Sequence, residues 1–140
     1  MKKILLGFLL VSTFVFADKI YEVKTSGVFI KDTLEIHSFV DEDTRGAVVC
    51  YYTLPKRSLS IEDQTDTSIS CRQVAKIEHG KHTQTNISSS SKSWFYKNMN
   101  IDRVYDEKRN VLIYLTYTKK LGGDNASNSI SIVPILNKNF

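Results

Sequence analysis

Residues 100–135 constrain the fold more than any other part of this 140-residue chain. They hold two dense apolar segments on either side of the polar sequence DEKRN, then a glycine-rich loop and a final alternating segment. Within DEKRN, Asp106 can close a turn through an Asx-type hydrogen bond, and Asn110 tolerates a left-handed backbone. The pattern predicts a β-hairpin followed by a closing strand, and the rest of the chain must pack around it.

The strands of this segment differ in their patterns. Residues 111–115 are apolar at every position, which predicts a central strand covered on both faces. Residues 129–133 alternate, and we expect Ile130 and Ile132 to point inward and Ser129 and Ser131 outward. Pro134 predicts that this last strand is an edge strand or ends there.

Strand patterns also dominate the first half of the chain. Residues 20–30 are rich in β-branched and aromatic side chains, with a break at residues 26–27, and residues 47–54 form an apolar strand that Pro55 should end. Between them, residues 33–40 alternate, with Leu34 and Ile36 on one face and Glu35 and His37 on the other. The polar residues 41–46 then connect a second predicted hairpin.

The middle of the chain is less regular. Residues 68–77 favour a strand, with a short helix over residues 66–74 as the alternative. Residues 79–93 form either a loop or a solvated edge strand, and residues 93–105 return to strand composition. These about seven strands predict an all-β fold, an antiparallel sandwich or barrel-like meander; an α+β fold is the second choice.

The N-terminus has the features of an export signal. Lys2 and Lys3 precede an almost unbroken apolar segment, and the sequence Val-Phe-Ala before Asp18 suits a signal peptidase. A membrane span needs about 20 apolar residues, and Asp18 ends this segment too early. We expect residues 1–17 to be a signal peptide cleaved after Ala17, residues 18–140 to form one periplasmic domain, and no membrane span to remain.

Composition narrows the class of partner. Without the signal peptide the domain keeps 17 of its 19 basic residues against 15 acidic ones, and both signs are interspersed. Nucleic-acid-binding proteins concentrate basic residues in one stripe, so we expect no nucleic-acid partner. An envelope protein or a small ligand is the expected partner.

Cys50 and Cys71 are the two cysteines of the chain, and in an exported protein they allow one intramolecular pairing. Alternatives are a redox pair or a thiol nucleophile beside His79 or His82. A redox pair usually has the CxxC spacing, which is absent here. The compartment and the cysteine count favour a structural disulfide.

Candidate chemical sites are weak. Glu78, His79 and His82 could offer metal ligands, but a helical HExxH motif needs histidines four apart and these are three apart. Three acids near the hairpin could act as an acid–base pair, yet two of them suit the polar tip of a turn: Asp102, Asp106 and Glu107. The sequence therefore predicts no catalytic residue, no cofactor and no metal ion.

Aromatic and basic residues suggest an interaction patch. Tyr51 and Tyr52 must point to opposite faces of a strand, so one of them could be exposed. The residues we predict for such a patch are Tyr52, Tyr114, Lys108 and Arg109. The sequence favours burial of the tyrosines in a sandwich over such a patch, and solvation of turns explains the cations equally well.

The sequence VYDEKRNVLIYLTYTKKL, followed by NSISIVPI, resembles the C-terminal signature of the CreA family, small exported bacterial proteins of unknown function. Residues 46–51 and 68–74 are similar to the two cysteine segments of the family, and Phe29 stands where a family aromatic follows the first strand. Two features differ from the family pattern: a glycine-rich insertion between the cysteines is absent, and Ala75-Lys76 replaces a frequent Gly-Pro.

The resemblance implies a fold, an exported location and a disulfide, but no activity. Two functional hypotheses follow. The favoured one is a non-enzymatic binding or interaction module of the cell envelope. The alternative is a small, hydrolase-like envelope enzyme with an unrecognised acid–base site, which would require a concave pocket that gathers titratable groups.

Overall fold

The computed structural model describes residues 18–26, 32–56, 67–89, 99–118 and 128–136. They form eight strands and one short 3-10 helix, which confirms the predicted all-β fold. The elements are β1 Asp18–Ser26, β2 Asp32–Val40, η1 Glu42–Thr44, β3 Val48–Lys56, β4 Ile69–Gln73, β5 Gln84–Ser89, β6 Met99–Asp106, β7 Val111–Thr118 and β8 Asn128–Pro134. The predicted signal peptide and Phe29 lie outside the described residues. Among the described residues, no helix has the length and apolarity needed to cross a membrane.

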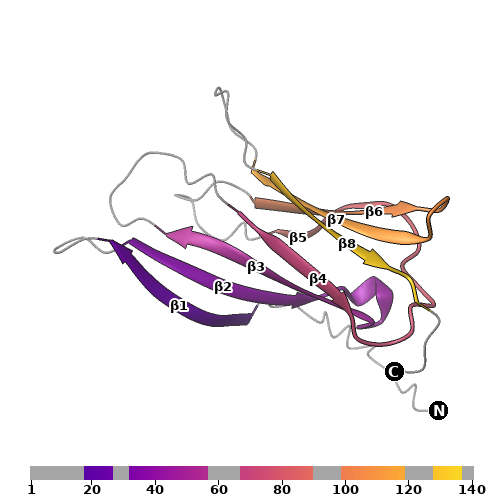
Figure 1. Ribbon diagram of the computed structural model, residues 1–140, viewed down its shortest axis with the longest axis horizontal. Coiled ribbons are helices and arrows are strands. Elements are labelled where there is room, and N and C mark those ends of the chain that lie inside the picture. The colour runs from indigo at the N-terminus through magenta and orange to yellow at the C-terminus, as the bar shows by residue number, and fades with distance from the viewer. Residues whose placement is uncertain (1–17, 27–31, 57–66, 90–98, 119–127, 137–140) are drawn as a thin grey trace, which may run out of the picture.

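The strands form two four-stranded antiparallel sheets, ordered β1-β2-β3-β4 and β5-β6-β7-β8 (Figure 1). Every strand pairs with its neighbour in sequence within its sheet, so each sheet is a simple meander. The inner faces enclose a core of buried side chains: Phe39, Ala47, Val48, Cys50, Tyr52, Ile69, Ile77, Met99, Ile101, Leu112, Tyr114, Val133 and Ile135. Of the two predicted all-β forms, the antiparallel sandwich is observed, with eight strands where about seven were predicted.

The sheets meet along a seam between β4 and β8. The backbone N–H of Ile69 donates to Ser129 Oγ at 3.4 Å, and that of Cys71 donates to Ser131 Oγ at 2.8 Å. The two edge strands therefore run in the same direction, joined through serine hydroxyls instead of a backbone ladder.

This seam reverses the orientation predicted for β8. Ile130 and Ile132 are 57% and 54% exposed, whereas Ser129 and Ser131 face β4. The predicted alternation is present, but its inward and outward faces are exchanged. Backbone N–H groups on the edge of β4 need acceptors, and the serine hydroxyls supply them.

The structure also corrects the prediction that β7 is covered on both faces. Its even-numbered residues are buried, but Val111, Ile113, Leu115 and Tyr117 are only half-buried. Within the described residues, the second layer packs on one side of β7. The prediction that β7 is a central strand is confirmed, since it lies between β6 and β8.

Two further predictions concern β3 and β4. Residues 69–73 form a strand, as favoured over the helix, and pair with Val48–Tyr52. Pro55, however, lies inside β3 and pairs with Leu34, so the predicted end at Pro55 is wrong. The pairing of β3 with β4 ends at Tyr52, so beyond Tyr52 β3 pairs only with β2. Proline has no backbone N–H to donate, and it is tolerated where one side of a strand has no partner strand.

The turn between β6 and β7 follows the sequence prediction. The backbone N–H of Arg109 donates to Asp106 Oδ1 at 3.2 Å. Asn110 has a left-handed backbone, with φ of 53°. Both residues therefore have the local roles expected from their side-chain chemistry.

A tight turn after β4 packs against η1. Gly80 has φ of +76°, and a Cβ there would lie 2.8 Å from Thr44 Cγ2 and 3.1 Å from Asp43 O. Thr44 is buried, and its hydroxyl donates to the backbone oxygen of Asp41 at 2.7 Å. Only glycine therefore fits both the backbone conformation and the space at position 80.

We expect Gly80→Ala to lower the free energy of unfolding by about 1–2 kcal/mol, because it adds both left-handed strain and a clash. Gly46 is a matched control, since its φ is +78° but a Cβ at that position would make only ordinary contact, 3.6 Å from Val40 Cγ1. Urea unfolding should rank Gly46→Ala as the milder change. Equal losses would show that the contact with Thr44 has no energetic role.

Candidate functional site

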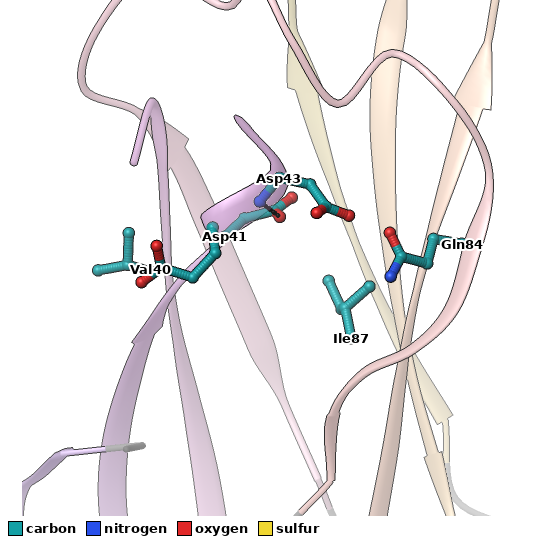
Figure 2. Close-up of a pocket in the computed structure, with 6 residues that line it drawn as sticks. Val40, Asp41, Asp43, Gln84 and Ile87 are labelled. Atoms are coloured by element: carbon teal, nitrogen blue, oxygen red, sulfur yellow. Dashed lines mark hydrogen bonds between the residues drawn. The ribbon is translucent and has the colours of Figure 1, made fainter. Parts of the chain in front are cut away.

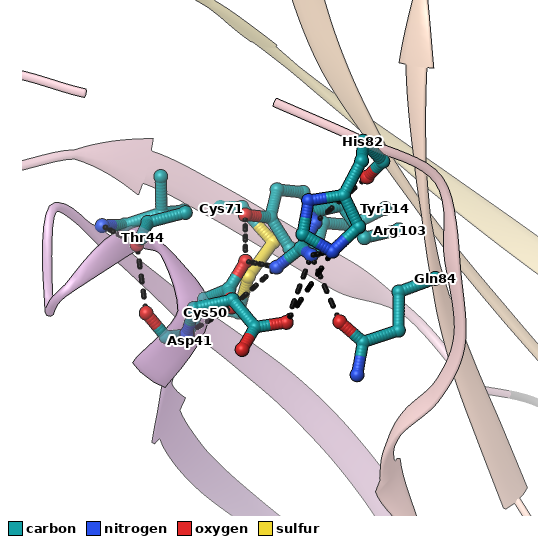
Figure 3. A network of polar contacts seen from close by, with 10 residues as sticks. Asp41, Thr44, Cys50, Cys71, His82, Gln84, Arg103 and Tyr114 are labelled. Atoms are coloured by element: carbon teal, nitrogen blue, oxygen red, sulfur yellow. Dashed lines mark hydrogen bonds and ion pairs between the residues drawn. A yellow bond between two sulfur atoms is a disulfide. The ribbon is translucent and has the colours of Figure 1, made fainter. Parts of the chain in front are cut away.

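A buried ion pair joins the two sheets. Arg103 lies on β6, and Asp41 immediately follows β2. Nη1 of Arg103 donates to both carboxylate oxygens of Asp41, at 2.7 Å each (Figure 3). Arg103 is 0% exposed and Asp41 is 3% exposed. Solvent therefore screens this pair weakly, and each charge depends on the other for its compensation.

The remaining nitrogens of Arg103 are also occupied. Nε donates to the backbone oxygen of His82 at 3.3 Å. Nη2 lies 3.0 Å from Asp43 Oδ2, 3.0 Å from Gln84 Oε1 and 3.2 Å from His82 Nε2. The guanidinium can only donate, and the two hydrogens of Nη2 are matched by the oxygens of Asp43 and Gln84. The side chain of Arg103 is thus committed to internal acceptors from β5, η1 and the loop before β5.

Tyr114 completes this cluster, which we define as Asp41, Asp43, His82, Gln84, Arg103 and Tyr114. Its hydroxyl donates to Asp41 Oδ2 at 2.6 Å. Burial and the neighbouring Asp41 carboxylate raise the pKa of Tyr114 well above its usual range. Burial alone would lower the pKa of Arg103, but the contacts with Asp41 outweigh it and raise that pKa. The cluster holds fixed charges and fixed protons, which suits a structural clamp better than proton transfer.

A small hollow open to solvent lies beside the cluster. It is lined by Val40, Asp41, Glu42, Asp43, Gln84 and Ile87 and has a volume of about 80 Å³. Figure 2 shows Asp41 and Asp43 on the side of η1 and Gln84 and Ile87 across the hollow. Ligand pockets usually measure about 300–1,000 Å³, so this hollow has room for a few water molecules only.

A second group of charges surrounds Glu35 on the inner face of β2. Its carboxylate lies 2.9 Å from Lys19 Nζ, 2.7 Å from Lys56 Nζ and 2.8 Å from His37 Nε2. Burial would raise the pKa of Glu35, but these hydrogen bonds lower it to about 2. The ring of His37 stacks on that of Tyr52, with the ring centroids 5.4 Å apart. Burial and the negative charge of Glu35 raise the pKa of Tyr52 to about 12.

Glu35 should make stability depend on pH in the acid range. Its carboxyl binds a proton more readily in the unfolded chain, near pH 4.5, than in the folded protein, near pH 2. Its contribution is therefore complete above about pH 4.5 and is lost as the pH falls toward 2. We expect a loss of about 2 kcal/mol, after allowing for solvent screening of the partly exposed lysines.

Urea unfolding between pH 7 and 2 checks this expectation. Glu35→Gln should flatten the acid limb of the stability curve. Glu78→Gln should change it far less, because solvent screens the exposed ion pair of Glu78 with Lys76. An unchanged acid limb in Glu35→Gln would contradict the assignment.

The structure pairs Cys50 with Cys71 in a disulfide, as predicted. The two residues lie directly opposite each other on β3 and β4, with Cα atoms 4.0 Å apart. Cys50 is fully buried, and the bond forms part of the core.

The four residues of the predicted interaction patch do not share a surface. Tyr52 and Tyr114 are 2% and 0% exposed, so neither can form an exposed aromatic patch. Tyr51 is the exposed member of its pair, as the opposite-face argument requires. Lys108 and Arg109 lie on the exposed turn between β6 and β7, where Arg109 pairs with Asp106 at 3.0 Å.

The other candidate residues are dispersed. Glu78 and His79 are exposed, while His82 belongs to the Arg103 cluster. Within the described ranges, no three His, Cys, Asp or Glu side chains are grouped to hold a metal ion. Asp102 accepts from the backbone N–H of Asn86 at 2.7 Å and from the Tyr117 hydroxyl at 3.1 Å. It thus supports β5 and β7, and Glu107 lies exposed on the turn.

Sequence reasoning missed Asp41, Arg103 and the role of Glu35. One signal was present: Arg103 alternates with Met99 and Ile101, which places a charge on an otherwise apolar strand face. Its partner Asp41 lies 62 residues away in an ordinary polar loop sequence, so the pair has no local signature.

Comparisons with known proteins show the family of the chain. The family described as CreA protein matches residues 20–138. The chain belongs to the CreA family. Protein CreA of Escherichia coli strain K12 is 34% identical over 113 residues, covering 72% of this chain and 71% of that protein. The CreA proteins of E. coli O6:H1 and O157:H7 match with the same identity and coverage. No solved structure matches the chain.

The range that matches the CreA family, residues 20–138, includes both cysteine strands, the seam and the Arg103 cluster. In this CreA family member the buried polar groups therefore belong to the shared domain and not to an added segment. The names of the relatives state no activity, so the surface of the domain has to indicate the function.

Proposed function

We propose that this CreA family member is a non-enzymatic binding module of the periplasm, and that it binds an envelope protein. The observation that supports this best is an apolar surface on the outer face of β7 and β8. Ile130 and Ile132 are more than half exposed there. Ile113 and Leu115 lie beside them in register, half-buried on β7. Exposed apolar patches on soluble domains mark interaction sites more often than not.

Charges border this β7–β8 surface at one end. Lys108 and Arg109 project from the turn that leads into β7. A basic rim beside an apolar centre is the usual arrangement of a protein interface, in which the rim steers association and the centre supplies affinity. The expected partner is therefore a protein with an apolar strip and an acidic border.

Export is the second part of the proposal. The N-terminal sequence has the features of a signal peptide, and disulfides such as Cys50–Cys71 persist in oxidising compartments. Cell fractionation should place the protein in the periplasm with Asp18 as its first residue. Recovery of the uncleaved chain from the cytoplasm would contradict this location.

The binding function can be tested with a photo-crosslinking residue at position 130 in cells that express the full chain. We expect a defined crosslinked partner, and Ile132→Thr should weaken the crosslink. Salt should weaken the wild-type crosslink, and Lys108→Glu/Arg109→Glu should weaken it already at low salt. Val23→Thr, an exposed change on the opposite sheet, is the matched control. If Ile132→Thr and Val23→Thr crosslink alike, the β7–β8 surface is not the binding site.

A further inference from the structure

The outer face of the β1–β4 sheet has an unusual composition. Tyr21 and Tyr51 are 60% and 41% exposed, and Val23 and Val40 on the same face are also exposed. Exposed large apolar side chains of this kind are rare on a face that remains in solvent. The β5–β8 sheet lies on the other side of the core, so it does not cover them (Figure 1).

Strand register shows that these side chains form one continuous surface. Paired residues of an antiparallel sheet project to the same side, and the pairs here are Tyr21 with Ile36, Val23 with Leu34, Val40 with Val49, and Ser38 with Tyr51. Small polar side chains of β3 and β4 continue the surface: Thr53 and Ser70. We call this the β1–β4 outer face. It is mainly apolar, with small hydroxyl groups among the apolar side chains and one charged residue on each outer strand.

We propose that the β1–β4 outer face is the interface of a homodimer, in which a second copy of this chain packs sheet against sheet. This goes beyond the proposed partner binding, which uses the opposite sheet. Face-to-face sheets pack about 10 Å apart with their strands rotated by about 30°, and tyrosines are favoured in such interfaces.

The size of the face fits a second copy. β1, β2 and β3 have nine residues each, and β4 has five. With a rise of about 3.3 Å and a spacing of about 4.8 Å, the three long strands cover roughly 30 Å by 14 Å and β4 adds roughly 16 Å by 5 Å. Projecting side chains enlarge that flat area toward the ~800 Å² that each partner of a standard stable interface buries. The apolar β7–β8 surface is only two strands wide, because Asp102 and Asp106 flank it on β6, and is too small for a stable dimer.

The charges of the face fit the same arrangement. Asp18 on β1 pairs in register with Ser38, and Arg72 on β4 pairs with Val49, so both project from the outer face at opposite sides. A two-fold axis about 15° from the strand direction gives the rotation of about 30° and places β1 of one copy over β4 of the other. Asp18 and Arg72 stand two residues apart along the strands, about 7 Å, a distance that an arginine side chain can span. Each Arg72 can therefore reach Asp18 of the second copy, which gives two equivalent ion pairs.

The sheet edges disfavour the competing mode, in which strands of two copies pair side by side. β1, the exposed edge, has register shifts between Lys19 and Tyr21 and between Lys24 and Ser26. Such bulges prevent a regular ladder with another chain. At the opposite edge, β4 donates its N–H groups to Ser129 and Ser131 of β8. The face, not the edge, is therefore the surface open to a second copy.

Analytical ultracentrifugation of the protein expressed from the full chain tests the dimer. We expect twice the monomer mass at micromolar concentration, and a Kd raised by ~10-fold or more in Tyr51→Asp, at the centre of the face. Ile130→Asp is the matched control on the opposite sheet and should leave the mass unchanged. Thermal unfolding of each variant establishes that it is folded.

The ion pair between Arg72 and Asp18 gives a second, independent test of the dimer. Arg72→Asp alone should weaken the dimer. Adding Asp18→Arg should restore it, since the new guanidinium and the N-terminal α-ammonium at position 18 then both face the new carboxylate. A wild-type protein that stays monomeric, or a dimer that Ile130→Asp disrupts and Tyr51→Asp does not, would overturn the proposal. Crosslinking at position 130 tests the β7–β8 surface alone. A monomeric protein would therefore overturn the dimer but not the proposal that this surface binds a partner protein.

Discussion

Replacing Arg103 by methionine is expected to lower the free energy of unfolding by about 3–5 kcal/mol. Methionine fills much of the same volume but leaves the Asp41 carboxylate buried without its cation. Asp43, Gln84 and the backbone oxygen of His82 also accept hydrogen bonds from Arg103, and the variant loses them. These contacts hold the loop before β5. Urea unfolding followed by circular dichroism measures the loss.

Arg109→Met is the matched control for this prediction. Arg109 also pairs with an aspartate at 3.0 Å, but its side chain is 70% exposed. Solvent screens such a pair, so the control should cost far less. The double variant Asp41→Leu/Arg103→Met should regain part of the stability, because it no longer buries an unpaired charge. Similar losses in Arg103→Met and Arg109→Met would show that the buried pair does not clamp the sheets.

Removal of the disulfide should have the second-largest effect, about 3 kcal/mol. Cys50 and Cys71 close a loop with a sequence separation of 21. Opening that loop gives the unfolded chain more conformations, so Cys50→Ala/Cys71→Ala should unfold at a lower urea concentration than the wild type. The variant also loses packing in the core, because Cys50 is fully buried.

A reductant separates these two contributions. Dithiothreitol should destabilise the wild type but leave Cys50→Ala/Cys71→Ala unchanged. Thiol titration of the unfolded, unreduced wild type should find neither cysteine reactive. Two reactive thiols would contradict the disulfide, whatever the stability of the variant.

Local features of the fold were predictable because their causes lie within a few residues. The turn at Asp106 and Asn110 depends on their own side-chain chemistry, and alternation in residues 33–40 separates Leu34 and Ile36 from Glu35 and His37. Alternation does not state which face is inward, however. The apolar Leu34 and Ile36 lie on the outer face, while Glu35 is buried among cations that come from β1 and β3.

The candidate site was less predictable for the same reason. Arg103 meets its acceptors on η1, β5 and the preceding loop, which are brought together only by packing of the two sheets. Ile130 and Ile132 have the pattern of core residues, and their exposure depends on unpaired N–H groups of β4, 60 residues away. The sequence contains the residues of each cluster but not the proximity that gives them a role.

The serine seam between β4 and β8 has a consequence for the order of folding. The hairpin of β6 and β7 needs only a short turn to close, whereas Ile69 and Cys71 meet Ser129 and Ser131 across 60 residues. Long-range contacts carry the larger loop-closure entropy and slow the folding of β proteins. We therefore expect the hairpin to form before the seam closes, so that β4 and β8 meet late in folding.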